Sequence, residues 1–165
     1  MGKTAIAVEI GANVSRAGRG VLYFSLEMGD VPLAQRALSS IMFDDIGGGS
    51  IAYSRIARGH LNAAEMQRLD AASEKLDRLP MRIEPQPGLS VSQMAARTRR
   101  TKKQFEMAGV ELGLVVVDHI GLVGASSRYA GDRVREIGEI SGALHALARG
   151  ARRPRSDAVA IVAGD

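Results

Sequence analysis

Cysteine and tryptophan are absent from this sequence, and only 4% of its residues are aromatic. Without cysteine the chain can form no disulfide framework and no zinc site with thiolate ligands. Its three histidines, His60, His119 and His145, are too scattered to predict a metal site of another kind. We therefore expect a cytoplasmic protein that holds no zinc.

Long apolar runs are also lacking. No stretch approaches the roughly 20 residues that a membrane-spanning helix needs, and the N-terminus does not have the residue order of a signal peptide. We therefore expect no membrane association. The chain has 165 residues, 45% of them hydrophobic, and a net charge of +4. This length and composition predict one domain with a substantial core, and the charge permits a polyanionic partner without requiring one.

Two kinds of apolar segment alternate along the chain. Apolar residues at helical spacing predict helices over residues 4–16, 31–43, 61–79, 90–108 and 132–149. Short, almost wholly apolar runs predict strands at residues 21–25, 81–84, 114–118 and 158–163. This alternation is typical of an α/β domain in which helices cover both faces of a parallel sheet. The buried face of the last helix is expected to carry Val134, Ile137, Ile140, Leu144 and Leu147.

The first predicted helix opens with Gly2, Lys3 and Thr4, which match the end of the phosphate-binding loop G-x-x-x-x-G-K-[ST]. In that loop the backbone N–H groups bind phosphates, the lysine reaches the β- and γ-phosphates, and the hydroxyl ligates Mg²⁺. The motif therefore predicts a site for a nucleoside triphosphate with Mg²⁺. Three residues alone can also match by chance.

Two carboxylates are placed where they could complete such a site. Asp118 ends the most hydrophobic predicted strand, where a Walker-B acid would hold Mg²⁺ at the carboxyl edge of a parallel sheet. Glu27 follows the strand at residues 21–25 and could orient or deprotonate the attacking water. Each residue taken alone could equally be an ordinary acid at the end of a strand or in a turn. Together with Gly2, Lys3 and Thr4 they favour a nucleotide site.

Four sequence blocks carry a resemblance to a known family. They are Gly-Lys-Thr at 2–4, Phe-Ser-Leu-Glu-Met at 24–28, Val-Val-Val-Asp-His-Ile-Gly-Leu-Val at 115–123, and Glu-Ile-Gly-Glu-Ile-Ser at 136–141. Their order and spacing resemble the ATPase domain of DnaB-type hexameric replicative DNA helicases, over roughly residues 1–149. The block at 24–28 is the most specific of the four.

This resemblance implies a RecA-like P-loop NTPase fold and an ATP-dependent DNA helicase. It implies that Gly2, Lys3 and Thr4 bind ATP, that Thr4 and Asp118 associate with Mg²⁺, and that Glu27 is the catalytic carboxylate. Full-length members of the family form hexameric rings on single-stranded DNA. The resemblance therefore also implies self-association and, in the full-length protein, contact with a primase or a helicase loader.

Two basic segments are candidates for contact with DNA. The helix predicted over residues 90–108 carries a cluster between Arg97 and Lys103, which we interpret as a solvated face because charged stripes usually are. The loop predicted over residues 124–135 follows the strand that ends at Asp118. It carries Arg128, Arg133 and Arg135 and could face the channel of a ring. An ordinary flexible surface loop is nearly as good an interpretation of this segment.

The sequence departs from the family pattern at several places. The first glycine of the phosphate-binding loop and the strand before it would lie upstream of Met1, and the family's last strands would lie beyond Asp165. His119 and Gly121 replace the usual aromatic residue and glutamine after the Walker-B acid. We therefore expect residues 1–165 to form a partial RecA-like domain. This start would be explained if Met1 is an internal methionine of a longer family member.

Two other hypotheses are open. The chain could belong to a different RecA-fold ATPase, such as a recombinase, although the blocks at 24–28 and 136–141 argue against it. It could also be a truncated, non-catalytic remnant that binds no ATP. The incomplete phosphate-binding loop favours this alternative.

Overall fold

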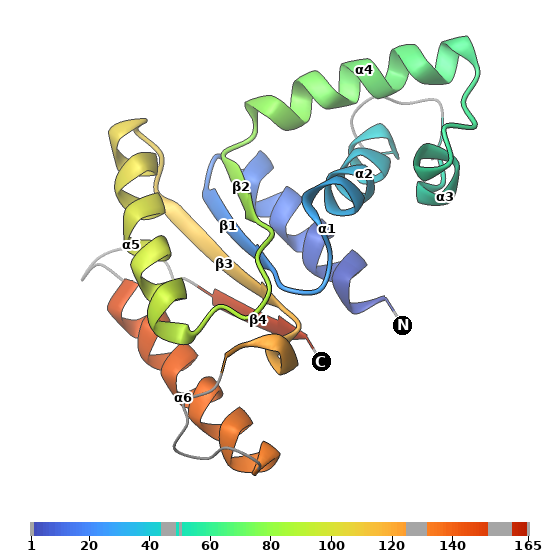
Figure 1. Cartoon of the computed structure of the whole chain (residues 1–165). Helices are drawn as coiled ribbons and strands as arrows, with labels where there is room; N and C mark the ends of the chain where they lie inside the picture. The colour runs from blue at the N-terminus through green and yellow to red at the C-terminus, as the bar shows by residue number, and fades with distance from the viewer. Residues whose placement is uncertain (1, 44–48, 50, 125–131, 152–159, 165) are drawn as a thin grey trace.

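A four-stranded parallel sheet lies at the centre of the molecule. The computed structural model describes residues 2–43, 49, 51–124, 132–151 and 160–164. Its strands are β1 (Gly20–Ser25), β2 (Met81–Glu84), β3 (Leu112–Asp118) and β4 (Ala160–Gly164), in the spatial order β2-β1-β3-β4. Each neighbouring pair is parallel. All the described strands therefore end at the same edge of the sheet (Figure 1).

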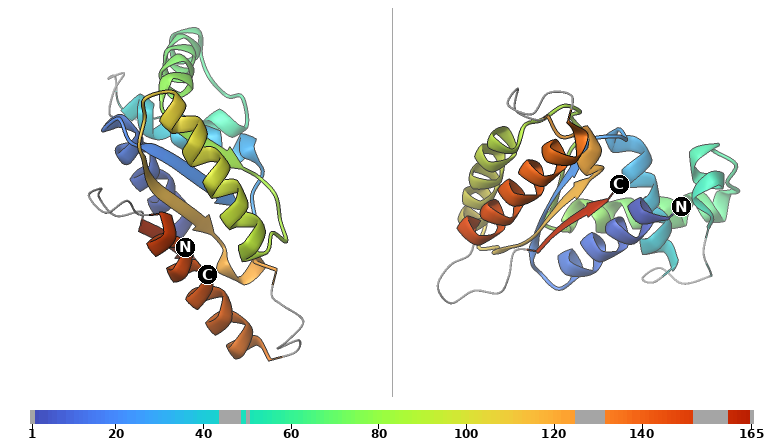
Figure 2. Two further views of the ribbon diagram at one scale, coloured as in Figure 1. Left: turned by 90° about the vertical axis from the view of Figure 1, so that its left-hand side faces the viewer. Right: turned by 90° about the horizontal axis from the view of Figure 1, so that it is seen from below.

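Helices cover both faces of this sheet, as the two views in Figure 2 show. On one face α1 (Lys3–Arg16) and α2 (Asp30–Ile41) enclose a core around Tyr23 and Val116. On the other face α5 (Val91–Met107) and α6 (Arg133–Ala151) enclose a core around Phe24 and Val117. Strands that are buried on both faces need apolar side chains in both directions, which is why β1 and β3 have almost no polar alternation.

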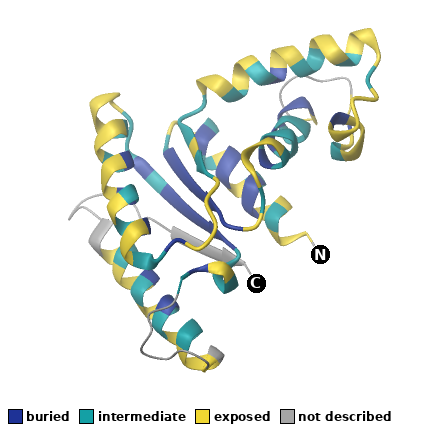
Figure 3. Cartoon of the chain, viewed as in Figure 1, coloured by how far each residue is buried: buried dark blue, intermediate teal, exposed yellow. Residues whose placement is uncertain are grey.

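A third, smaller core lies beside the sheet. It is built from α2, α3 (Tyr53–Ala57) and α4 (Ala63–Arg78), and its buried members are Ile41, Met42, Ile51, Ile56 and Ala72. Figure 3 shows that the outer side of α4 is almost wholly exposed, so this helix buries only a narrow stripe. A helix of this kind depends strongly on its end contacts, because little apolar area stabilises it.

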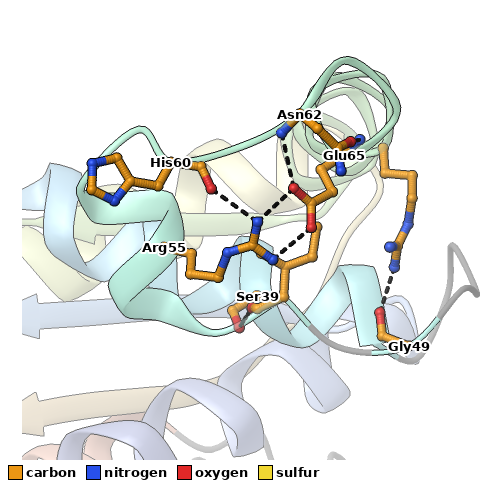
Figure 4. Close-up of polar contacts among 8 residues, drawn as sticks. Ser39, Gly49, Arg55, His60, Asn62 and Glu65 are labelled. Carbon is orange, nitrogen blue, oxygen red and sulfur yellow. Dashed lines mark hydrogen bonds and ion pairs between the residues drawn. The ribbon is translucent and has the colours of Figure 1, made fainter.

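The start of α4 is stabilised by a capping box (Figure 4). The Glu65 backbone N–H donates to Asn62 Oδ1 at 2.9 Å, and the Asn62 N–H donates to Glu65 Oε2 at 2.9 Å. Arg55 of α3 donates to both carboxylate oxygens of Glu65, at 2.6 and 2.8 Å, and to the carbonyl oxygen of His60 at 3.0 Å. The hydrogen bond from Arg55 is the largest of the effects that lower the pKa of Glu65. The box therefore joins α3 to α4.

Most elements predicted from the sequence are confirmed. Pro32 lies in the first turn of α2, Ser90 caps α5 by accepting from the Gln93 N–H at 3.3 Å, and Asp132 accepts from the Arg135 N–H at 3.2 Å. None of the helices within the described residues is long and apolar enough to cross a membrane. The prediction of an α/β domain with a helix-covered parallel sheet is therefore confirmed.

Three details of the prediction were wrong. Val134 does not lie on the buried face of α6, since its side chain is 81% exposed, whereas Ile140 and Leu144 are buried. The helix α3 was missed because its single turn of five residues is too short to show a period. The 3-10 turn at Ile120–Leu122 was missed for the same reason, since it has only three residues.

The basic cluster of α5 is divided between two environments. Arg99, Arg100 and Lys103 are exposed, as the interpretation of a solvated face requires. Arg97 differs, because it donates to Glu84 Oε2 of β2 at 2.8 Å and also to Gln86 Oε1. Arg97 therefore fastens α5 to the edge strand of the sheet and is a structural residue in this fold.

We predict that Asn62→Ala destabilises the α3–α4 region. Loss of the side-chain acceptor leaves the Glu65 N–H without its capping partner, which typically lowers the free energy of unfolding by about 1 kcal/mol. Urea denaturation followed by circular dichroism measures this as a lower midpoint at unchanged m-value. The control is Asn62→Asp, which keeps an acceptor at the cap and should unfold close to wild type. Equal midpoints for Asn62→Ala and wild type would contradict the assigned role.

Candidate nucleotide-binding site

The carboxyl edge of the sheet brings together the ends of three strands. In the pairing register Ser25 of β1 lies beside Asp118 of β3, and Asp118 lies beside Gly164 of β4. The helix α1 precedes β1 and is joined to it by a short turn, so it runs antiparallel to the strand and its first turn lies at this same edge (Figure 1). The fold therefore places residues 2–4 and the two candidate carboxylates at one edge.

The first turn of α1 has the features of an anion-binding helix start. Gly2 is the N-cap residue and has φ of 105°, a left-handed conformation that favours glycine. Lys3 is exposed, Thr4 is partly buried, and the first turn holds no acidic residue. The unpaired N–H groups of a helix start and the positive end of its dipole attract anions such as phosphate.

Asp118 is a buried carboxylate on the face of the sheet that α1 covers. Its side chain is only 6% exposed, and alternation along β3 gives it the same side as Val116, which packs in the core beneath α1 and α2. The Tyr23 hydroxyl donates a hydrogen bond of 2.9 Å to Asp118 Oδ2. Within the described residues Tyr23 is the one hydrogen-bond partner of this side chain, so Oδ1 has none there.

The environment of Tyr23 strongly favours its protonated form. Burial raises the pKa of the phenol, and the charge of Asp118 and the hydrogen bond to it raise that pKa further. The positive charge of Arg36 acts in the opposite direction with a smaller effect. Tyr23 therefore stays a hydrogen-bond donor to Asp118 well above the pH at which an exposed tyrosine ionises.

The turn that carries Glu27 is tied to the same edge. The Ser25 hydroxyl donates to the carbonyl oxygen of Met28 at 2.6 Å, and the Leu26 N–H donates to the carbonyl oxygen of Asp118 at 3.3 Å. The Glu27 side chain itself is exposed. A rigid turn with an exposed carboxylate can present that group to a ligand bound outside the sheet.

Two polar atoms near this edge are buried without hydrogen-bond partners among the described residues: His119 Nδ1 and Arg36 Nε. His119 follows Asp118 directly and is the one non-glycine residue there with positive φ, 78°. The Arg36 guanidinium stacks over the Tyr53 ring, 4.4 Å from its centroid. Buried polar atoms without a protein partner usually have an ordered water or an ion as their partner.

The structure describes only some of the predicted DNA-binding residues. Arg128 and the side chain of Arg133 lie outside the described residues. Arg133 and Arg135 belong to α6 and not to the predicted loop, because the helix starts directly after Asp132, which accepts from the Arg135 N–H. Arg135 is exposed in the first turn of α6 and forms an ion pair of 3.2 Å with Asp132. The described segment before them ends at Gly124, whose N–H donates to the carbonyl oxygen of Leu89 at 3.0 Å.

Sequence reasoning missed Tyr23, which it treated only as part of an apolar strand. A signal was available, because Tyr23 is the one residue with a hydroxyl inside the run from Val21 to Phe24. A buried tyrosine usually has a partner for its hydroxyl. The partner could not be deduced, because the pairing of β1 with β3 and its register were unknown.

Two hollows of the surface lie elsewhere, between α5 and α6. They have volumes of about 710 and 360 Å³, and both are lined by Val91, Ser92 and Ala143. Neither is lined by any of the predicted nucleotide-site residues. These hollows are therefore separate from the candidate nucleotide site.

Comparison with known proteins points to one family. A family model described as "DnaB-like helicase C terminal domain" matches residues 1–155. A protein named replicative DNA helicase DnaB, from Synechocystis, is 36% identical over 155 residues, which cover 93% of this chain and 16% of the relative. The chain spans between 16% and 30% of the length of the first curated relatives that it matches.

Two solved structures have similar folds, each with a TM-score of 0.80 and 26% sequence identity. One is described as a DnaB-like replicative helicase and its interactions with primase, and 99% of this chain matches 35% of it. The other is described as an ATPase domain, and 98% of this chain matches 52% of it. These likenesses confirm the predicted RecA-like, P-loop NTPase fold class and support the use of a nucleotide.

We predict that Tyr23 makes the folded protein lose stability in alkali. Unfolded tyrosine ionises at about pH 10, whereas the raised pKa of Tyr23 keeps its phenol protonated in the folded state above that pH. Its contribution to stability is therefore complete below about pH 10. Above that pH the folded state binds one proton more than the unfolded state, so the free energy of unfolding falls by about 1.4 kcal/mol per pH unit.

Urea unfolding of wild type and Tyr23→Phe, measured on both sides of about pH 10, tests this. The wild type should lose stability more steeply with rising pH than Tyr23→Phe does. The control is Tyr53→Phe, which should keep the wild-type slope. Parallel pH profiles for wild type and Tyr23→Phe would show that Tyr23 ionises as readily in the folded state as in the unfolded state.

Proposed function

Since the chain belongs to the DnaB-like helicase C-terminal domain family, we propose that it is the ATP-binding and ATP-hydrolysing part of a hexameric replicative DNA helicase. Such a ring would translocate on single-stranded DNA and unwind the duplex. One observation supports this most directly: Asp118 and the start of α1 share the carboxyl edge of the parallel sheet. This edge is where open α/β folds bind nucleotides.

In this proposal Gly2, Lys3 and Thr4 bind the phosphates of ATP. The N–H groups at the start of α1 would donate to phosphate oxygens, and the exposed Lys3 ammonium would neutralise the β- and γ-phosphates. The left-handed Gly2 lets the backbone approach a phosphate without a side chain in the way. A longer protein would supply the preceding part of the phosphate-binding loop.

The residues present fit a nucleotide-bound Mg²⁺. Mg²⁺ is a hard cation that takes oxygen ligands, and the Thr4 hydroxyl and the Asp118 carboxylate are the two candidates. Asp118 Oδ1 has no hydrogen-bond partner within the described residues, so it is available to a cation or to one of its waters. When bound, Mg²⁺ would neutralise charge that develops on the β- and γ-phosphate oxygens.

Glu27 is proposed as the catalytic carboxylate. Its turn is held by the Ser25 hydroxyl and by the Leu26 N–H bond to Asp118, so its exposed side chain starts from a fixed backbone. From there Glu27 would orient the water that attacks the γ-phosphate and accept a proton from it. The chemistry needs a carboxylate that the water can reach, which an exposed position provides.

The proposed partners follow from the family. Arg128 and, at the start of α6, Arg133 and Arg135 would contact single-stranded DNA in the channel of the ring. Self-association into a hexamer and contact with a primase or a helicase loader would belong to the longer protein. A solved relative is described together with its interactions with primase. We infer a cytoplasmic location, as suits a member of a replicative helicase family.

We predict that the purified chain binds Mg²⁺-ATP and that Lys3→Ala weakens this binding. Loss of a charge-assisted contact to phosphate should lower the affinity about 10- to 100-fold. Isothermal titration calorimetry measures the effect, after circular dichroism has shown that both proteins fold. The matched control is Lys103→Ala, an exposed lysine on α5 that should bind as wild type does. A folded wild-type chain that binds no ATP would support the non-catalytic remnant instead.

We predict that Arg128, Arg133 and Arg135 contribute to binding of single-stranded DNA. Joint substitution of Arg128, Arg133 and Arg135 by alanine should reduce affinity and lower the slope of log K against log salt by about 2. Fluorescence anisotropy with a labelled oligothymidylate over a salt series measures both. Substitution of Arg99, Arg100 and Lys103 removes the same charge from α5. Equal losses in the two triple variants would mean that net charge, and not these three arginines in particular, binds the DNA.

A further inference from the structure

A tyrosine hydroxyl reaches the candidate Mg²⁺ ligand from the neighbouring strand. Tyr23 pairs with Val116 in the register of β1 and β3, and Asp118 lies two residues further along β3 on the same face. Such a diagonal pair is separated by roughly 7–8 Å between Cα positions, which an aromatic side chain can span. The Tyr23 ring therefore lies along the sheet surface under α1 and α2, and its hydroxyl reaches Asp118 Oδ2 at 2.9 Å.

Burial of both Tyr23 and Asp118 restricts the geometry of the hydrogen bond between them. Tyr23 is fully buried and Asp118 is 6% exposed. Core packing restricts the Tyr23 side chain, because Val21, Leu33 and Val116 belong to the same buried cluster. A hydrogen bond from a fixed donor to one carboxylate oxygen also fixes the rotation of that carboxylate about its Cβ–Cγ bond.

We propose that Tyr23 is a positioning residue for metal binding, which holds Asp118 Oδ2 so that Oδ1 faces the nucleotide-bound Mg²⁺. This inference rests on the proposed function, since it assigns Asp118 to the metal. Oδ2 is occupied by the phenol, and Oδ1 is the oxygen without a partner among the described residues. One hydrogen bond therefore distinguishes the two oxygens: Oδ2 accepts from Tyr23, and Oδ1 is left for the metal.

Groups that orient a metal ligand in this way contribute strongly to metal affinity. Loss of an outer-shell hydrogen bond typically weakens metal binding about 10- to 100-fold, because the ligand becomes free to rotate away. Tyr23 makes no contact of its own with the start of α1 in the described hydrogen bonds, so its removal should spare the phosphate contacts. A purely structural tyrosine would not discriminate between nucleotide with metal and nucleotide without it.

The test compares wild type, Tyr23→Phe, Asp118→Asn and Tyr53→Phe. Electron paramagnetic resonance measures the Kd of Mn²⁺ in the presence of ADP, and calorimetry in EDTA measures ADP alone. Tyr23→Phe should weaken Mn²⁺ about tenfold and leave metal-free ADP unchanged. Asp118→Asn should weaken Mn²⁺ more, and Tyr53→Phe should match wild type.

The outcomes distinguish failure of the proposed metal site from failure of the proposed role of Tyr23. Equal Mn²⁺ affinity in wild type and Asp118→Asn, or none in wild type, overturns the proposed metal site and the inference with it. A clear loss in Asp118→Asn with full affinity in Tyr23→Phe overturns only the role of Tyr23. A parallel loss of Mn²⁺ and metal-free ADP in Tyr23→Phe also overturns it, because that result indicates a structural effect.

A measurement on the wild-type protein covers the case in which Tyr23→Phe does not fold. The chain has three tyrosines, so tyrosine labelled with ¹³C at Cζ yields a simple spectrum, and Tyr53→Phe helps to assign it. Saturation with Mg²⁺ and ADP should shift the Tyr23 Cζ resonance, because metal binding withdraws charge from the carboxylate that accepts its hydrogen bond. ADP without Mg²⁺ should not. An unchanged resonance at saturation overturns the inference.

Discussion

The parallel pairing of β1 with β3 is the constraint on which the rest of the structure depends. It puts Ser25 beside Asp118 and Tyr23 beside Val116. Parallel strands need crossover connections, and the connection from β1 to β3 passes through α2, α3, α4, β2 and α5. The pairing therefore brings Tyr23 into contact with Asp118, 95 positions further along the chain.

Burial of Asp118 has a cost that the surrounding residues offset. Asp118 is 6% exposed and has lost most of its hydration, and burial of a polar group is costly unless hydrogen bonds replace the lost water. The Tyr23 hydroxyl provides one hydrogen bond, and the remaining oxygen is free within the described residues. In the proposed site a nucleotide-bound Mg²⁺ would be the partner of that oxygen.

Polar contacts contribute more than apolar burial to the region around α3 and α4. Its small core contributes little apolar burial, so polar contacts carry much of its organisation: the capping box of Asn62 and Glu65, the Arg55 ion pair, and the Arg68 hydrogen bond to the carbonyl oxygen of Gly49 at 2.5 Å. Such contacts are local and lie mostly at the surface. They shape one side of the molecule without reaching the sheet edge where the candidate site lies.

The sequence by itself determined the elements and the motif residues, because these depend on local patterns. The apolar run before Asp118 predicted β3, Ser90 predicted the start of α5, and Gly2, Lys3 and Thr4 predicted a phosphate-binding helix start. Only the tertiary structure decided that Val134 is exposed, that Arg97 is tied to Glu84, and that the Tyr23 hydroxyl meets Asp118. These facts depend on strand order, register and the packing angles of helices, which arise from contacts between distant residues and leave no periodic trace in the chain.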